Sequence, residues 1–382
     1  MNCADKLPSM DTLGKLRVLS ADSQYDLACA CGTAEQEHRR RGADGNWLYP
    51  VTLPGGGTSI LLKTLLSNAC VNDCKYCPLR RDTNVRRCAL SPDETARCFM
   101  DYLARRNIYG LFLSSAVINT PDQTMERINA VAEILRRVYR FKGYIHLKII
   151  PGASDAAIGQ AVALASAVSL NIETPGEKYF RKLSVRKRFM EDIVRPLKLM
   201  ARLTAKGEQY ARVKTTTQFV VGAADETDAE IVRYMFGLYD RLRLRRIYFS
   251  AYQSGLGAPD IPGEASGAAA PDARCLREHR LYQVDFLIRK YGFRADDFSF
   301  DARSNLSLDL DPKECWAARH PDFYPVNVNL AGREELLRVP GIGPRTAELM
   351  LIRRRAGRLS SLQELNLRGK LLRKAMAYIR FN

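Results

Sequence analysis

The chain has 382 residues, of which 46% are hydrophobic and 26% charged, a composition typical of a globular protein with one large domain and smaller attachments. No apolar run approaches the roughly 20 residues that a membrane-spanning helix needs, so we expect a cytoplasmic protein rather than a membrane protein. The net charge of +17 favours a polyanionic partner, with nucleic acid first among the candidates.

From residue 58 to residue 254, short β-branched apolar runs alternate with longer amphipathic segments, as βα units around a parallel sheet do. We predict strands at 59–66, 110–114, 144–150, 167–173, 216–222 and 246–252. We predict helices at 92–106, 120–139, 154–164, 179–205 and 227–239, with N-caps at Ser91, Ser154 and Thr227. Six units predict an α/β fold, a partial (β/α)6 barrel like a TIM barrel, with its chemistry on the loops that follow the strands.

The flanking segments are less regular. Residues 1–57 form an N-terminal extension with no clear pattern. Residues 255–325 combine a Gly, Ala and Pro-rich linker with an amphipathic helix at 276–291, which we interpret as a linker and capping helix. Residues 326–382 are basic and predict a small all-α domain.

Three cysteines follow the first predicted strand in a CxxxCxxC spacing: Cys70, Cys74 and Cys77. Thiolates are soft ligands, and three at this spacing can hold three corners of an iron-sulfur cubane while one iron stays open. A structural zinc site needs four ligands, and the next cysteines along the chain, Cys88 and Cys98, lie in or beside a predicted helix. The spacing therefore favours a [4Fe-4S] cluster, with zinc or free core thiols as the alternative.

With the aromatic Tyr76 before its third cysteine, this motif resembles that of the radical S-adenosylmethionine (SAM) superfamily. The resemblance implies an enzyme whose open iron is chelated by SAM. It also implies that the reduced cluster passes one electron to the sulfonium of SAM, which yields a 5'-deoxyadenosyl radical. Such an enzyme needs an electron donor such as flavodoxin or ferredoxin.

The same resemblance implies SAM contacts at the ends of later strands. Ser114 and Ser115 stand where many members have a Gly-Gly-Glu stretch for the SAM amino group. Asn171 and Glu173 are similar to the Asn-x-acid pairs that hold the SAM ribose in relatives such as biotin synthase. Gln218 opens a segment resembling the GxIxGxxE stretch beside the adenine, although glutamine replaces its first glycine.

For other side chains of these strands, the sequence does not decide between a binding role and a structural role. An acid within an otherwise apolar strand is rarely buried unless it is paired, which favours a ligand role for Glu173, with a structural role as the alternative. His146, Lys148, Tyr248, Ser250 and Tyr252 recur at period two, so they either fill the barrel interior or contact a substrate.

Near the C-terminus, two short predicted helices flank the sequence Pro-Gly-Ile-Gly-Pro at 340–344, the pattern of a helix-hairpin-helix. Gly341, Ile342 and Gly343 would turn the chain tightly and expose backbone N–H groups to a phosphate at the start of the second helix, with Arg345 and Thr346 adding contacts. Such contacts carry no base information, so the module predicts DNA binding without sequence preference.

Residues 326–382 contain twelve Lys or Arg and four Asp or Glu, and Arg353–Arg355 are expected on the exposed side of the second helix. The alternatives are a hairpin that only packs against another domain and a charge run that is a solvated face.

Together, the barrel and the hairpin resemble a bacterial family of radical SAM proteins assigned to DNA modification or repair. The likeness includes Tyr25-Asp26 and the segments 111–115, 143–148, 151–154, 277–283 and 311–313. It implies chemistry on a nucleotide in DNA and a uracil-DNA glycosylase-like partner. An RNA-modifying radical SAM enzyme and a non-catalytic iron-sulfur DNA-binding protein are the alternatives. Cys29 and Cys31 could hold a second metal, but we interpret them as structural or incidental.

Overall fold

The computed structural model describes residues 10–26, 40–41, 47–52, 58–105, 108–265, 270–362 and 369–382. Cys29 and Cys31 lie outside these residues. The chain divides into two compact units, of which the first comprises Met1–Glu226 and Gly237–Cys275. The second comprises Thr227–Phe236 and Leu276–Asn382.

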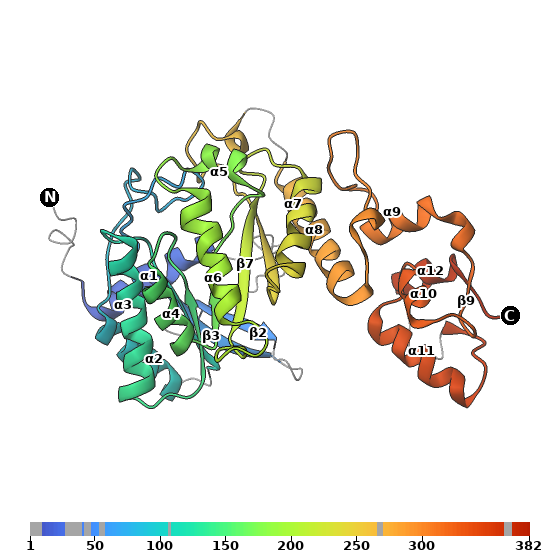
Figure 1. Ribbon diagram of the computed structural model, residues 1–382, viewed down its shortest axis with the longest axis horizontal. Coiled ribbons are helices and arrows are strands. Elements are labelled where there is room, and N and C mark those ends of the chain that lie inside the picture. The colour runs from blue at the N-terminus through green and yellow to red at the C-terminus, as the bar shows by residue number, and fades with distance from the viewer. Residues whose placement is uncertain are drawn as a thin grey trace. The chain divides into compact units, whose positions relative to one another are not determined.

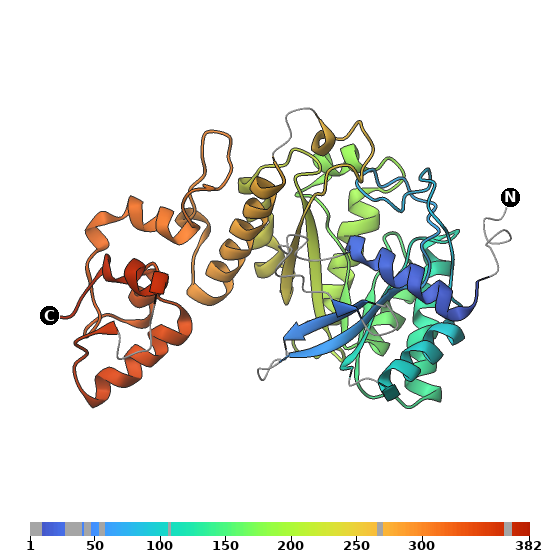
Figure 2. The same cartoon turned by 180° about the vertical axis from the view of Figure 1, so that it is seen from behind.

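The first unit is built on an eight-stranded sheet in the order β1 to β8. Its strands are β1 (Arg40–Arg41), β2 (Trp47–Thr52), β3 (Thr58–Leu65), β4 (Gly110–Ser114), β5 (Tyr144–Lys148), β6 (Ala167–Ser169), β7 (Lys214–Val221) and β8 (Arg246–Ala251). Strands β3 to β8 are parallel, which confirms the predicted six-stranded partial barrel. Strands β1 and β2 extend the sheet antiparallel beyond β3, and Figure 2 shows β2 beside β3.

Helices cover one face of this sheet, and Figure 1 shows α2, α3, α4 and α6 over it. The helices of the unit are α1 (Thr12–Asp22), α2 (Pro92–Arg105), α3 (Pro121–Glu133), α4 (Asp155–Leu164), α5 (Glu177–Leu183) and α6 (Arg195–Leu203), and α7 (Asp228–Asp240) spans the division between the units. The predicted caps form, because Ser91, Ser154 and Thr227 accept from the backbone N–H groups of Glu94, Ala157 and Glu230. Buried side chains such as Phe99, Leu111 and Met125 fill the space between helices and sheet.

Three predicted elements differ from the structure. The single helix predicted at 120–139 is α3 followed by a π-helical segment at Ile134–Val138. The strand predicted to reach residue 173 ends at Ser169, and Glu173 adopts a positive φ of 64° while bridging to Phe219. The single helix predicted at 179–205 is instead α5, a π-helical segment at Phe189–Val194 and α6. It breaks at Ser184, whose backbone is extended and whose hydroxyl bonds a side chain elsewhere in the unit.

The second unit contains most of α8 (Pro271–Tyr291), followed by α9 (Pro312–Arg319), α10 (Arg333–Arg338), α11 (Pro344–Ala356) and α12 (Gly369–Met376). Two short parallel strands, β9 (Val326–Asn327) and β10 (Ile379–Arg380), join the ends of its last module. Val328, Leu336, Val339 and Met350 belong to its buried core. Among the described residues, no helix is long and apolar enough to cross a membrane.

Two glycines of the first unit give a matched test of the barrel packing. A Cβ atom at Gly110 would overlap the carbonyl oxygen of Tyr144 on the neighbouring strand, whereas one at Gly159 in α4 meets nothing within 4 Å. Gly110→Ala should lower the free energy of unfolding by about 1–3 kcal/mol through overpacking. Gly159→Ala should raise it by about 0.5–1 kcal/mol through helix propensity. Urea unfolding of both variants measures this, and equal effects would contradict the packing of β4 on β5.

Candidate functional site

The three cysteines lie on the loop that connects β3 to α2. The guanidinium of Arg87 closes this loop on itself by donating to the carbonyl oxygens of Asn68, Leu79, Arg80 and Thr83. The side chain of Asn68 adds a second closure, since it accepts from the N–H of Cys88 at 2.7 Å. Hydrogen bonds from side chains to the backbone therefore tie the two ends of the loop together.

All nine barrel residues selected from the sequence line one cavity of about 200 Å³ in the first unit. They are Cys70, Cys74, Tyr76, Cys77, Ser114, Ser115, Asn171, Glu173 and Gln218. The three thiols are free and half-buried, while Cys88 and Cys98 are buried and do not line the cavity. Among the described residues, no three His, Cys, Asp or Glu side chains are arranged to hold a single metal ion.

Glu173 connects the cysteine loop to the strand ends. It is 5% exposed and accepts from the hydroxyl of Tyr76 at 2.6 Å and from the Asn171 side-chain amide at 3.4 Å. Burial and the Glu173 carboxylate raise the pKa of Tyr76 well above its usual value, so Tyr76 stays a hydrogen-bond donor. The Oδ1 atom of Asn171 is buried and has no hydrogen-bond partner, so this cavity presents an acceptor suited to a ligand hydroxyl or N–H.

Lys187 is a further charged residue in the cavity lining, and it was not predicted from the sequence. Its side chain is 8% exposed and its Nζ lies 5.3 Å from the ring centroid of Phe180. Burial alone would lower the pKa of Lys187, but the neighbouring Cys74 and Glu173 raise it above its usual value. In turn, burial raises the pKa of Cys74, and Lys187 offsets part of that rise.

The residues with an open assignment separate into two groups. Lys148, Ser250 and Tyr252 line the cavity, whereas His146 and the half-buried Tyr248 do not. His146 lies deeper, with its Nε2 at 2.8 Å from the hydroxyl of Ser169 and its ring 4.2 Å from that of Phe112. The N-terminal segment also contributes Asp22, Gln24 and Tyr25 to the lining. Apart from the family likeness of Tyr25, no local pattern in the sequence indicates these residues.

In the second unit, the predicted hairpin joins α10 to α11. Gly341 has a φ of +85°, and a Cβ atom there would approach the carbonyl oxygen of Leu371 to 2.6 Å, so only glycine fits. The Ile342 side chain is buried in the core of the module, and Gly343 is the N-cap of α11. Arg345 is exposed in the first turn of α11, and Thr346 follows it half-buried.

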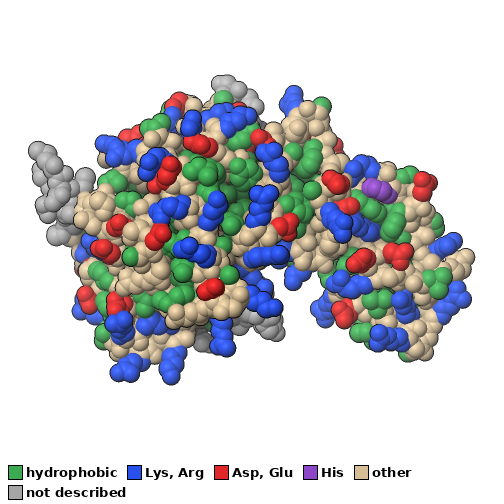
Figure 3. Space-filling model, viewed as in Figure 1, with side chains coloured by type: hydrophobic (Ala, Val, Ile, Leu, Met, Phe, Trp, Pro, Cys, Tyr) green, Lys and Arg blue, Asp and Glu red, His purple; other side chains and the backbone are tan. Residues whose placement is uncertain are grey.

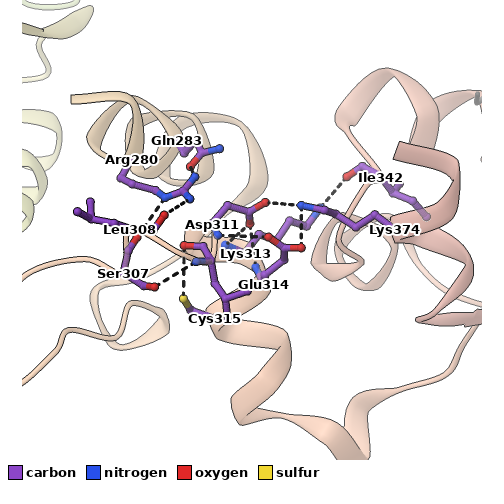
Figure 4. A network of polar contacts seen from close by, with 11 residues as sticks. Arg280, Gln283, Ser307, Leu308, Asp311, Lys313, Glu314, Cys315, Ile342 and Lys374 are labelled. Atoms are coloured by element: carbon purple, nitrogen blue, oxygen red, sulfur yellow. Dashed lines mark hydrogen bonds and ion pairs between the residues drawn. The ribbon is translucent and has the colours of Figure 1, made fainter. Parts of the chain in front are cut away.

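A buried lysine supports this hairpin from α9 (Figure 4). The Nζ of Lys313 donates to the carbonyl oxygen of Ile342 at 2.6 Å, and Lys313 is 8% exposed. Burial lowers the pKa of Lys313 to about 7; Asp311 opposes this shift, and Arg338 and Lys374 add to it. Lys374 of α12 also bonds Asp311 at 2.9 Å and Glu314 at 2.7 Å, so α9 and α12 are tied together beside the hairpin.

The arginine run at the end of α11 is only partly exposed. Arg353 and Arg355 face solvent, but Arg354 is half-buried and donates to the carbonyl oxygens of Val328 and Ala331. The expectation that all three are exposed is therefore wrong for Arg354, because these two carbonyls need a donor. Figure 3 shows Lys and Arg side chains spread over the visible face of both units rather than gathered in one patch.

No protein-family model matches the sequence, and a search of curated proteins gives no match. Among solved structures, methylornithine synthase is similar with a TM-score of 0.45 and 15% identity, over 59% of this chain and 62% of that chain. The FeFe-hydrogenase maturase HydG from Carboxydothermus hydrogenoformans gives a TM-score of 0.44 and 14% identity, over 59% and 51%. The cobalamin-dependent S-adenosylmethionine radical enzyme OxsB gives a TM-score of 0.31 and 16% identity, over 42% and 24%. This chain thus spans less than two thirds of each of these proteins.

Replacement of Lys187 by methionine tests the electrostatics of the cavity. The Lys187 ammonium offsets part of the rise in the Cys74 pKa that burial causes, so its removal should raise that pKa further. Because the thiolate is the reactive form, alkylation of Cys74 by iodoacetamide at pH 8 should slow several-fold. Lys182→Met is the matched control, because Lys182 pairs with Asp225 at 2.6 Å and does not line the cavity. Mass spectrometry of Cys74 follows the reaction. An equal rate in wild type and Lys187→Met would place Lys187 away from the thiol.

Proposed function

We propose that this protein is a radical SAM enzyme that acts on a nucleotide in DNA, for repair or modification. One observation supports the assignment as a radical SAM enzyme. The three motif thiols line the same cavity as Tyr76, Glu173 and Asn171, whose side chains are linked by hydrogen bonds. The proposal that the substrate is a nucleotide in DNA rests on the hairpin of the second unit and on the family resemblance of the sequence.

The residues fit a [4Fe-4S] cluster with SAM beside it. A cubane binds each thiolate through a different iron atom, so Cys70, Cys74 and Cys77 need not converge on one point. Lys187 supplies a buried positive charge next to this anionic ligand set. When bound, the reduced cluster would supply one electron for cleavage of SAM to a 5'-deoxyadenosyl radical.

The chain itself would bind and orient the cofactor. Tyr76 holds the Glu173 carboxylate, which together with Asn171 can bond the two ribose hydroxyls of SAM. The unpaired Oδ1 of Asn171 is the acceptor that such a hydroxyl would satisfy. Ser114 and Ser115 offer hydroxyl acceptors for the amino group, and Gln218 lies on the strand proposed to meet the adenine.

For DNA, we propose contacts to the phosphate backbone from the hairpin residues Gly341, Ile342 and Gly343 through their main chain, and from the side chains of Arg345 and Thr346. A nucleotide within a duplex would have to be flipped out to reach a radical, which costs a few kcal/mol and favours damaged or single-stranded sites. A uracil-DNA glycosylase-like protein is the partner that the family resemblance proposes.

Anaerobic iron and sulfide analysis, with electron paramagnetic resonance of the reduced protein before and after SAM addition, tests the cofactor assignment. A four-iron cluster whose signal shifts with SAM supports it, and bound zinc or a signal indifferent to SAM contradicts it. Formation of 5'-deoxyadenosine with duplex DNA, single-stranded DNA or tRNA then distinguishes a DNA substrate from an RNA substrate.

Cys74→Ala should lose the four-iron cluster and the SAM-dependent signal, because a thiolate ligand is removed. It should keep its DNA affinity within about twofold, since phosphate contacts and not the cluster would supply that affinity. Cys315→Ala, which removes a free thiol of the second unit, is the matched control and should keep both properties. Joint loss of cluster and DNA binding in Cys74→Ala would contradict separate sites.

Lys313→Met tests the hairpin. It leaves the Ile342 carbonyl without its donor, a loss of about 1–3 kcal/mol, so DNA affinity should fall by about tenfold as the hairpin loosens. The salt dependence should not change, because a buried side chain makes no phosphate contact. Arg345→Ala should instead lower both the affinity and the salt slope, the latter by about one. Fluorescence anisotropy with duplex DNA across a salt series measures both quantities.

A further inference from the structure

Part of the cavity lining comes from outside the parallel strands. The end of α1 contributes Asp22, and the 3-10 helix Ser23–Asp26 that follows it contributes Gln24 and Tyr25. Both elements pack beside β3. The residues fitted to the cluster and to SAM come instead from the cysteine loop, from the ends of β4 and β6 and from β7. The N-terminal segment therefore supplies lining side chains that the cofactor assignment does not use.

Asp22 is the carboxylate of this segment. Its Oδ2 accepts from the side-chain amide of Asn68 at 2.6 Å, which fixes the group beside the cysteine loop. Its other oxygen accepts no hydrogen bond from the described part of the chain. Burial raises the pKa of Asp22, while the bond from Asn68 and the charge of Arg87 oppose that rise. A half-buried carboxylate with one open oxygen would be stabilised by an N–H donor on a ligand.

Tyr25 is the aromatic residue of the segment, three positions after Asp22. It lines the cavity although 41% of the residue is exposed, so it lies where the cavity opens to solvent. Among the described residues, no other aromatic ring and no cation packs on it. An exposed ring at the edge of a cavity is a surface on which a flat ligand can stack.

We infer that Asp22 and Tyr25 form a subsite for a nucleobase that carries an exocyclic amino group, with the base stacked on Tyr25 and its amino group donating to Asp22. This inference rests on the proposed function and names residues that would hold the flipped-out nucleotide. Enzymes that flip a base read it by stacking and by hydrogen bonds to its edge. An acidic side chain accepts from the amino group of cytosine, whereas thymine has a carbonyl oxygen at that position. The subsite should therefore prefer cytosine to thymine.

The ammonium group of SAM is the competing donor for Asp22. The arrangement favours a base, because the open carboxylate oxygen and the exposed ring come from one short segment, and the amino-acid part of SAM has no flat surface to stack. A nucleotide also carries a phosphate. Lys148, which is 9% exposed and lines the same cavity, is a cation suited to that group.

The test uses the full chain with its cluster reconstituted anaerobically and with excess SAM, so that the SAM site is filled. The probe is the deoxynucleoside monophosphate of 2-aminopurine, whose fluorescence falls when its base stacks, and a titration gives its Kd. Tyr25→Ala removes the ring, and Tyr25→Phe keeps it. The matched control is Tyr109→Ala, because Tyr109 is 40% exposed, lies before the amino end of β4 and does not line the cavity.

We expect Tyr25→Ala to raise the Kd of the probe about tenfold, and Tyr25→Phe and Tyr109→Ala to stay within about twofold of the wild type. Competition then tests Asp22. Deoxycytidine monophosphate should displace the probe from the wild type at about a tenfold lower concentration than thymidine monophosphate. Asp22→Asn should remove this preference, because an amide can donate to thymine as well as accept from cytosine.

An unchanged Kd in Tyr25→Ala, or an equal loss in Tyr109→Ala, overturns the subsite. So does an Asp22→Asn variant that loses SAM affinity but keeps the preference for cytosine, which would assign Asp22 to the SAM ammonium. Electron paramagnetic resonance of the same samples separates this inference from the proposed function. A cluster signal that shifts with SAM in a protein that does not bind the probe overturns the subsite alone. A signal indifferent to SAM overturns the proposed function, and this inference with it.

Discussion

The arrangement of the first unit's cavity depends on the contact between Asp73 and Ser184, the residue at which helix α5 ends. The Ser184 hydroxyl donates to Asp73 at 2.5 Å, and the same oxygen accepts from the N–H of Lys187 at 3.3 Å. One short hydrogen-bonded chain thus fixes the cysteine loop and turns Lys187 inward. Burial opposes ionisation of Asp73, but the hydrogen bonds from Ser184 and from the backbone of Val185 and Arg186 lower its pKa below the usual value. Their contribution to stability is therefore present at neutral pH and is lost as the pH falls through that lowered pKa.

Two buried lysines show how neighbours decide the charge of a group. Lys187 lies beside Cys74 and Glu173, so its pKa is raised and it remains an ammonium. Lys313 is buried with Arg338 and Lys374 nearby and bonds a neutral carbonyl, so its pKa falls to about 7. Burial disfavours the charged form of both. The first lysine can therefore serve as a permanent counter-charge, while the second serves mainly as a hydrogen-bond donor that holds the hairpin.

Local patterns predicted most of the barrel. The parallel strands and the caps at Ser91, Ser154 and Thr227 follow from periodicity and capping patterns. The nine cavity residues were selected from the cysteine spacing and the family resemblance, and their shared cavity agrees with the rule that strand ends meet at one edge. The helix break at Ser184 could not be predicted, because residues 179–205 have helical periodicity and the bond that ends α5 comes from Asp73, 111 positions away. Lys187 was missed for the same reason, since within a continuous basic helix it looks like a solvated side chain.

The net charge of +17 overstates how much free positive charge the surface offers. Several guanidinium groups bond backbone carbonyls inside the fold: Arg87 closes the cysteine loop, Arg136 bonds Phe141, Gly143 and Leu164, and Arg354 holds the segment before α10. Each such arginine satisfies buried acceptors at a loop end, where no secondary structure supplies a donor. A cation used in this way has little freedom to move to a phosphate or to a partner's carboxylate. The free positive charge of the surface therefore has to be counted from the side chains that have no internal partner, and composition alone overstates it.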